Sequence, residues 1–171
     1  MSQIYTALGE IEPLDELKGG DIFFRKELDL EDGYRELKIV EILKDKNFRN
    51  IVDIYNTCSK CIDMELLDIH ADDKKIGNIT ADIRNAIEQL HSVGIIYIDI
   101  RRDNMGYSHI AGKWKLFDFD ASGIVEKGDD TVWVMEPPTY ATYKKYSSCR
   151  REGGFKQLDR VILEDFLHTI K

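Results

Sequence analysis

The first half of the chain consists of short apolar runs around one amphipathic stretch. Residues 21–28 (DIFFRKEL) are apolar and aromatic and follow two glycines, which predicts a strand leaving a turn. Apolar residues recur every three or four positions in residues 31–46, which predicts a helix. Residues 50–58 and 61–69 are predicted to form a β-hairpin. The helix positions expected to face the core are Tyr34, Leu37, Val40 and Leu43, and those expected to face away are Glu36, Lys38 and Glu41.

The second half follows a short polar stretch and is predicted to be mainly helical. Its first helix carries apolar residues on one face between Ile79 and Leu90. Asn78 or Thr80 is the expected N-cap, because short polar side chains accept hydrogen bonds from the first turn. Gly94 is the expected end of this helix.

The rest of the second half is predicted as two strands, a loop and a closing helix. Residues 95–100 (IIYIDI) and 113–120 (KWKLFDFD) are apolar enough to be buried strands. Residues 121–154 contain glycine and proline turn signals and are predicted to be mainly loop. Residues 155–171 are predicted to form a helix that is apolar on most sides and therefore buried.

This order of elements predicts an α+β fold with one domain of two lobes. Strands and one helix come first, and a mainly helical part with one strand pair follows. The first lobe is expected over about residues 1–67 and the second over about 71–171, with the connection near 65–70. A chain of 171 residues with 43% hydrophobic residues is long enough and apolar enough for one packed domain.

Charge and the N-terminal sequence narrow the class of protein. The formal net charge of −8 argues against nucleic-acid binding, which needs a basic face. The N-terminus lacks the basic region and apolar run of a signal peptide, and the longest apolar run is far shorter than the roughly 20 residues that a membrane helix needs. We therefore expect an intracellular, cytoplasmic protein with no membrane segment.

The three cysteines do not form a disulfide framework by count. Cys58 and Cys61 form a CxxC pair at the tip of the predicted hairpin, without a second pair or histidines at zinc-ligand spacing. We expect plain hairpin cysteines, with a redox or a metal role as the two alternatives.

Three polar residues sit at the ends of the two apolar strands of the second half. Asp99 and Asp118 each come just as an apolar run ends, and Asn104 follows Asp99 by five positions. A buried carboxylate must be paired, hydrogen-bonded or bound to metal. Asp and Asn oxygens suit Mg²⁺, which is normally shared with substrate phosphates. The alternative is that these residues only cap strands and loops.

At these residues the sequence resembles the protein-kinase superfamily. Residues 97–104 (YIDIRRDN) resemble its catalytic loop, in which an Asp is followed five positions later by an Asn, and residues 118–120 (DFD) resemble its D-F-G element. The segment LHSVGIIYIDI also has the helix, glycine and strand that lead into that loop. The resemblance covers about residues 22–170.

The first half resembles the nucleotide-binding lobe of the same superfamily. Lys26 falls where the family has its strand lysine, and Glu36 lies on the helix that supplies its partner. Met64 resembles the gatekeeper residue before the hinge, and the resemblance implies that the backbone of Glu65 and Leu67 contacts adenine.

The resemblance implies ATP and Mg²⁺ as ligands and a role for each polar residue. Lys26, oriented by Glu36, would hold the α- and β-phosphates. Asp118 and Asn104 would each bind a Mg²⁺ ion. Asp99 would orient the acceptor hydroxyl and take its proton.

Two further residues have family counterparts. Arg101 lies two positions after Asp99, where Ser/Thr protein kinases have a lysine that contacts the γ-phosphate. Asp159 resembles an Asp of a buried helix that holds the catalytic loop in place. A protein Ser/Thr substrate or partner is therefore expected.

Several positions depart from the family pattern. No glycine-rich loop is evident, and Phe24 stands two residues before Lys26, where the family has a small residue above adenine. Gly106 takes the place of an apolar residue below the purine. Ile98 replaces an Arg that binds the phosphorylated activation loop, so activity is expected not to depend on such phosphorylation. Asp120 replaces the Gly of D-F-G and adds a carboxylate.

The chain also ends where the family's buried C-lobe helix ends, which predicts a truncated C-lobe. The resemblance is thus to virus-encoded minimal kinases and to atypical small kinases of the RIO and KEOPS types. A virus-encoded protein would act in the host cytoplasm or nucleus. Three functions follow as expectations: an active Ser/Thr protein kinase, a pseudokinase that acts as a binding module, and a small-molecule kinase.

Overall fold

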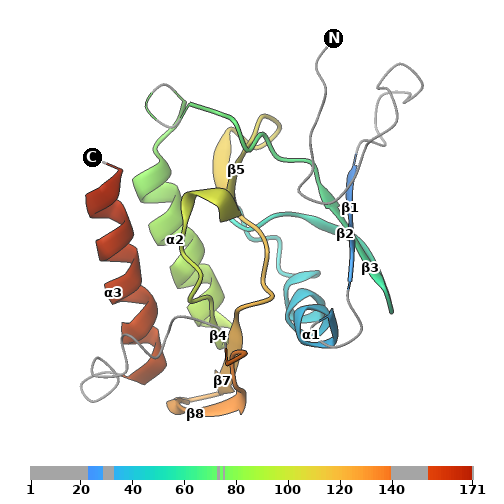
Figure 1. Ribbon diagram of the computed structural model, residues 1–171, viewed down its shortest axis with the longest axis vertical. Coiled ribbons are helices and arrows are strands. Elements are labelled where there is room, and N and C mark those ends of the chain that lie inside the picture. Colours follow the sequence, from blue (N-terminus) through green and yellow to red (C-terminus); the bar gives the residue numbers. More distant parts are fainter. Residues whose placement is uncertain (1–22, 29–32, 73, 75, 140–153, 171) are drawn as a thin grey trace.

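The computed structural model describes residues 23–28, 33–72, 74, 76–139 and 154–170, and it confirms an α+β fold. Within these residues there are three α-helices and three small antiparallel sheets (Figure 1). The ends of several predicted elements lie outside the described residues, as does the N-terminal stretch examined for a glycine-rich loop.

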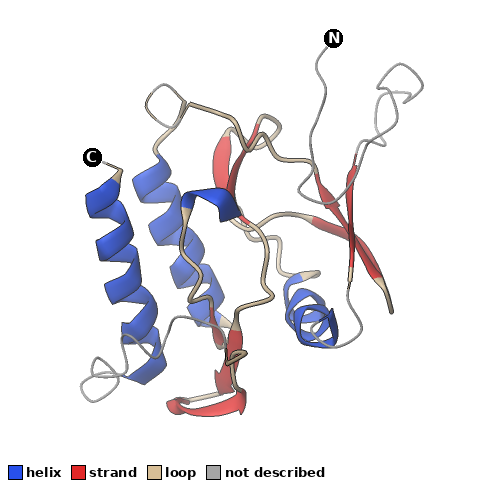
Figure 2. Ribbon diagram, in the orientation of Figure 1, coloured by secondary structure: helices blue, strands red, loops and turns tan. Residues whose placement is uncertain are grey.

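The first sheet has the strand order β1-β3-β2 and is antiparallel throughout. Strand β1 spans Phe23–Glu27, β2 spans Ile54–Cys58 and β3 spans Cys61–Glu65. Strands β2 and β3 are the predicted hairpin, which is thereby confirmed. Helix α1 (Gly33–Leu43) packs beside this sheet, away from the other two helices (Figure 2).

Helix α1 is confirmed, but the face that it buries is partly different from the prediction. Tyr34 was expected to face the core and is 65% exposed, whereas Glu36 was expected to face away and is 2% exposed. Ile39, Val40 and Leu43 are buried. The apolar pattern alone excludes a carboxylate from the buried face, but Glu36 has a cationic partner there, and pairing offsets the cost of burying its charge.

The two cysteines of the hairpin are disulfide-bonded in the structure. Cys58 and Cys61 face each other in the β2–β3 register and form a disulfide with their Cα atoms 5.1 Å apart. The expectation of plain cysteines did not include this bond. Within the described residues, no group of three or more His, Cys, Asp or Glu side chains is arranged to hold a metal ion.

Helices α2 (Ile79–Ser92) and α3 (Gly154–Thr169) pack side by side on the opposite side of the molecule from the first sheet (Figures 1 and 2). Asn78 is the N-cap of α2, since its side chain accepts a hydrogen bond from the Ala81 backbone at 3.0 Å. Helix α2 ends at Ser92 with Val93 as its C-cap, and Gly94, the predicted end, follows directly with φ of +80°. Helix α3 has a solvent face, so it is less completely buried than the prediction.

The second sheet contains a hairpin that the sequence pattern did not predict. Its order is β4-β7-β8, with β4 at Ile95–Ile96, β7 at Gly123–Glu126 and β8 at Asp129–Met135. The prediction of mainly loop is therefore wrong for β7 and β8. These strands are stabilised from outside, because Trp133 stacks on Phe155 of α3 with ring centroids 3.8 Å apart.

The third sheet is the hairpin of β5 (Met105–Ser108) and β6 (Lys113–Leu116). The strands predicted at 95–100 and 113–120 are both shorter than expected, because each is followed by a left-handed residue. Ile98 has φ of +70° and Asp118 has φ of +63°. A strand cannot continue through such a residue, so the chain turns there.

One hydrophobic core connects these parts. It includes residues from α1, β3, α2, β6 and α3, and its largest fully buried side chains include Trp114, Tyr97, Phe119 and Phe155. No helix in the described part of the chain is both long enough and apolar enough to cross a membrane.

A single carboxylate of α3 fixes the turn that follows β4. Asp159 is 0% exposed, and it accepts hydrogen bonds from the backbone N–H groups of Tyr97 and Ile98, each at 2.8 Å. His91 of α2 contacts the same carboxylate through Nε2 at 2.8 Å. These contacts replace the strand partner that Tyr97 and Ile98 lack, and they hold the left-handed turn that presents Asp99.

We predict that Asp159→Asn lowers the free energy of unfolding by about 3–5 kcal/mol, because an amide cannot accept from all three donors in a buried site. Urea unfolding followed by circular dichroism would measure the change. Asp165→Asn, at an exposed position of the same helix, should change stability by less than about 1 kcal/mol. A similar small loss for Asp159→Asn would contradict this account of the turn.

Candidate active site

Three charged side chains from distant segments meet at the edge of the first sheet. Lys26 lies on β1, Glu36 on α1, and Asp118 just after β6. The Lys26 Nζ atom lies 2.8 Å from Glu36 Oε2 and 2.7 Å from Asp118 Oδ1. The Lys26 and Glu36 side chains are 17% and 2% exposed, so this is a mostly buried cation between two carboxylates.

The surroundings of Lys26 favour its charged form. Burial opposes the charge, but the carboxylates of Glu36 and then Asp118 together outweigh burial, so the pKa of Lys26 lies above its usual value of 10.5. Burial raises the pKa of Glu36 above its usual 4.5, and Lys26 acts in the opposite direction. Lys26 therefore stays protonated at neutral pH, as a cation between the two carboxylates.

Glu36 also connects the cluster to the segment after β6. Its Oε1 atom accepts a hydrogen bond from the Phe119 backbone at 3.2 Å. Phe119 packs edge-on against the ring of Tyr97, with centroids 5.7 Å apart. The position of α1 is thus coupled to the DFD segment and to the turn held by Asp159.

A second polar group lies in the loop after β4. The Asn104 side chain donates through Nδ2 to Asp99 Oδ2 at 2.8 Å and to the Asp99 backbone oxygen at 3.1 Å. Arg101 Nε lies 3.1 Å from the same Oδ2 atom. Asn104 is 2% exposed at the end of the short 3-10 helix η2 (Arg102–Asn104), whereas the Arg101 side chain is 57% exposed.

Backbone contacts connect the second group with the first. The Phe117 N–H donates to the Asn104 carbonyl at 3.2 Å, and the Tyr97 hydroxyl donates to the Phe117 carbonyl. Asp118 follows directly. Burial, then the charge of Asp118, raises the pKa of Asp120, and Asp99 adds to this in the same direction. Asp120 therefore lies within electrostatic reach of Asp118 in the first group and of Asp99 in the second.

Two side-chain oxygens of this site are of the chemical kind that a hydrated divalent cation prefers. Asn104 uses its amide nitrogen for both contacts to Asp99, and no described group donates to its Oδ1 atom. Asp118 contacts Lys26 through Oδ1. Mg²⁺ prefers such hard oxygens, takes few protein ligands and keeps water or phosphate in its other positions. Asn104 Oδ1 and Asp118 Oδ2 are the donors that would hold it.

The segment predicted to contact a purine begins at the end of β3. Met64 is buried and lies opposite Phe24 in the β1–β3 register, so the two side chains share a face with Lys26. Leu67 lies against Gly106: a Cβ added at Gly106 would be 2.5 Å from Leu67 Cβ. Leu67 therefore occupies the space that a side chain at position 106 would fill.

Glu65 has a buried role that the sequence analysis missed. Its Oε2 atom lies 2.7 Å from the Nζ atom of Lys115, and its Oε1 atom accepts from the Ser108 hydroxyl. The lysine also contacts Asp53 Oδ2 at 3.0 Å. The available signal was Lys115 itself, a charged residue between Trp114 and Leu116 in a strand that was predicted to be buried.

Comparison with known proteins does not show a family for this chain. No family model matches the chain, and no curated protein is similar enough to it to count as a relative.

We predict that the titration midpoint of Lys26 lies above its usual value of 10.5. Since its pKa is raised on folding, its contribution to stability is fully present below pH 10.5 and is lost as the pH rises through the folded-state pKa. NMR titration of the Lys26 Cε signal would measure the midpoint. Glu36→Gln should lower it by about one unit or more, since burial remains while an attractive charge is lost. Glu41→Gln, exposed on the same helix, should leave it unchanged. A wild-type midpoint at or below 10.5 would refute the prediction.

Proposed function

We propose that this chain is an ATP- and Mg²⁺-dependent phosphotransferase of protein-kinase type that transfers the γ-phosphate to a hydroxyl group, with a protein Ser/Thr residue as the acceptor. The observation that carries the proposal is the cluster in which Lys26 lies between Glu36 and Asp118, with Asp99 close enough to the neighbouring Asp120 to raise its pKa. Phosphoryl transfer needs this kind of site, because positioning and charge neutralisation supply most of the catalysis.

The arrangement of elements supports a two-lobed, kinase-like fold. The sheet β1-β3-β2 with α1 would be the N-lobe, residues 65–70 the hinge, and residues 71–171 a C-lobe that ends with α3. Lys26 comes from the first lobe, and Asp99 and Asp118 come from the second. A nucleotide bound between the lobes would meet all three.

The reaction can be written from the side chains. Lys26 would bind the phosphates of ATP, with Glu36 keeping it oriented. Asp99 would accept the proton of the acceptor hydroxyl. At the same time the hydroxyl oxygen would form a bond to the γ-phosphorus, and the bond between that phosphorus and the ADP oxygen would break. Bound Mg²⁺, held by Asn104 and Asp118, would neutralise phosphate charge. Arg101 is exposed beside Asp99, where its guanidinium can turn toward the transferred phosphate.

A second candidate is a binding module without catalysis, a pseudokinase. Three observations favour it. Leu67 lies directly against Gly106, and Phe24 shares the sheet face of Lys26 beside Met64. Both contacts reduce the space for a purine, and the pairing of Arg101 with Asp99 occupies the proposed base.

We predict that the purified chain transfers labelled phosphate from ATP, either to itself or to a mixed Ser/Thr peptide library. Asp99→Asn and Asp118→Asn should each lower the rate by about 100-fold or more, because each removes a carboxylate acting at the transferred group. Asp103→Asn, an exposed carboxylate in the same loop, is the matched control and should retain activity.

Thermal unfolding with ATP and Mg²⁺ distinguishes the candidates. Nucleotide at 100 times its Kd should add about 2.7 kcal/mol of stability to any chain that binds it. Stabilisation without phosphate transfer would favour a nucleotide-binding pseudokinase. If ATP and Mg²⁺ gave no stabilisation and no phosphate transfer were detected, the proposal would be overturned.

A further inference from the structure

Lys115 is a buried lysine at the centre of a polar network behind the proposed hinge. It is 2% exposed, and its Nζ atom contacts Glu65 at 2.7 Å and Asp53 at 3.0 Å. Ser108 completes the network by donating to the other oxygen of Glu65. Burying this many charged groups is costly, and only pairing offsets the cost. Such a network can therefore fix geometry as well as add stability.

The network fixes the start of the hinge through both its side chain and its backbone. The Glu65 side chain is held by Lys115, and the Glu65 N–H donates to the Asp53 carbonyl at 2.9 Å. Two residues later, Leu67 lies against Gly106. Asp68 and Tyr107 then exchange two backbone hydrogen bonds, each of 3.0 Å.

These contacts lie on one face of the β5–β6 hairpin. Lys115 is directly opposite Gly106 in the register, so the two positions share a face, and Ser108 lies on that face two residues further along. The segment 65–67 therefore crosses this face, with Lys115 at one end of the contact and the side-chain-free Gly106 beneath Leu67.

The same hairpin connects the two proposed cation ligands. Strand β5 begins directly after Asn104, and β6 ends two residues before Asp118. A rigid link from Lys115 to Glu65 therefore sets the distance between the backbone that would meet the purine and the side chains that would meet the phosphates.

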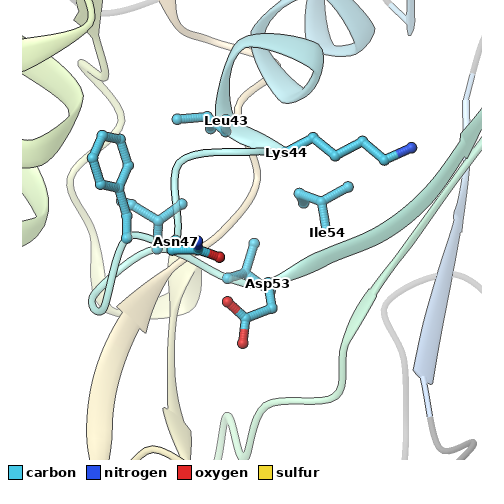
Figure 3. A pocket seen from close by; sticks show the side chains of 8 residues that line it. Leu43, Lys44, Asn47, Asp53 and Ile54 are labelled. Carbon is cyan, nitrogen blue, oxygen red and sulfur yellow. The ribbon is translucent and has the colours of Figure 1, made fainter.

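Only the Asp53 end of the network reaches solvent. The Asp53 side chain is 52% exposed and lines a pocket of about 130 Å³ together with the end of α1. Figure 3 shows its carboxylate turned away from the amino group of Lys44, another residue of this pocket. Asp53 is thus paired inward with Lys115, while Glu65 stays buried.

We propose that Lys115 is a positioning residue for base recognition: through Glu65 it holds the backbone of residues 65–67 where a purine can bind. This inference rests on the proposed function, because it assumes that a nucleotide binds between the hinge and Lys26. Selectivity among nucleotide bases would then depend on Lys115, a residue that does not itself contact the base.

The test compares Lys115→Met with Lys113→Met, a lysine on the same strand whose Nζ contacts Asp82 of α2 at 3.2 Å instead of the hinge. In phosphate-transfer assays with ATP and CTP, Lys115→Met should raise the KM for ATP about tenfold and reduce the preference for ATP over CTP by a similar factor, with kcat within about threefold. Lys113→Met should leave both unchanged, and Lys115→Arg should recover most of the preference.

A second variant separates positioning from folding. Lys115→Met alone leaves Glu65 buried without its cation, so it can unfold the chain. The double variant Glu65→Leu with Lys115→Met removes both charges and should recover thermal stability, but not the preference for ATP. Recovery of both would overturn the inference, as would a single variant that folds and keeps wild-type base selectivity. Wild-type protein that neither binds nor uses ATP would overturn the proposed function as well, so the two failures are distinguishable.

Discussion

The buried carboxylate of Asp159 is the interaction on which the arrangement of the site depends. It receives two consecutive backbone N–H groups and the ring of His91, all at 2.8 Å. A residue such as Ile98 seldom adopts a positive φ, because its β-branched side chain meets the backbone there. The hydrogen bonds to Asp159 compensate for that strain. Helix α3, at the far end of the chain, thereby determines the direction in which Asp99 leaves the core.

Charge pairing explains how the side chains of the site are held together. Lys26 lies between two carboxylates, so its cation holds α1 and the DFD segment to the same strand. The Phe119 N–H adds a second link from that segment to Glu36. In the proposed function, an incoming polyphosphate would compete with Asp118 for Lys26, and Asp118 would then be available to a cation.

The local elements were predictable from sequence where pattern and burial agree. The hairpin of β2 and β3, helix α2 with its Asn78 cap, and helix α3 follow from apolar spacing and capping residues. The β7–β8 hairpin was not predictable, because its packing depends on Trp133 meeting Phe155 from α3. The apolar pattern also placed Glu36 on the wrong face, because apolar spacing contains no information about the ion pair with Lys26 that allows Glu36 to be buried. The Lys115 network depends in the same way on partners from three separate segments.

The close approach of Leu67 to Gly106 means that the two positions share one volume. A side chain added at 106 would have to take space that Leu67 now fills, with its first carbon only 2.5 Å from Leu67 Cβ. Gly106 therefore cannot gain a side chain unless the residue at position 67 becomes smaller. A reciprocal exchange, small at 67 and large at 106, would move the apolar surface from one strand to the other while keeping the total volume. Substitutions at positions 67 and 106 should consequently occur together among related sequences. In a variant library in which only one of the two positions is changed, most chains should fold poorly.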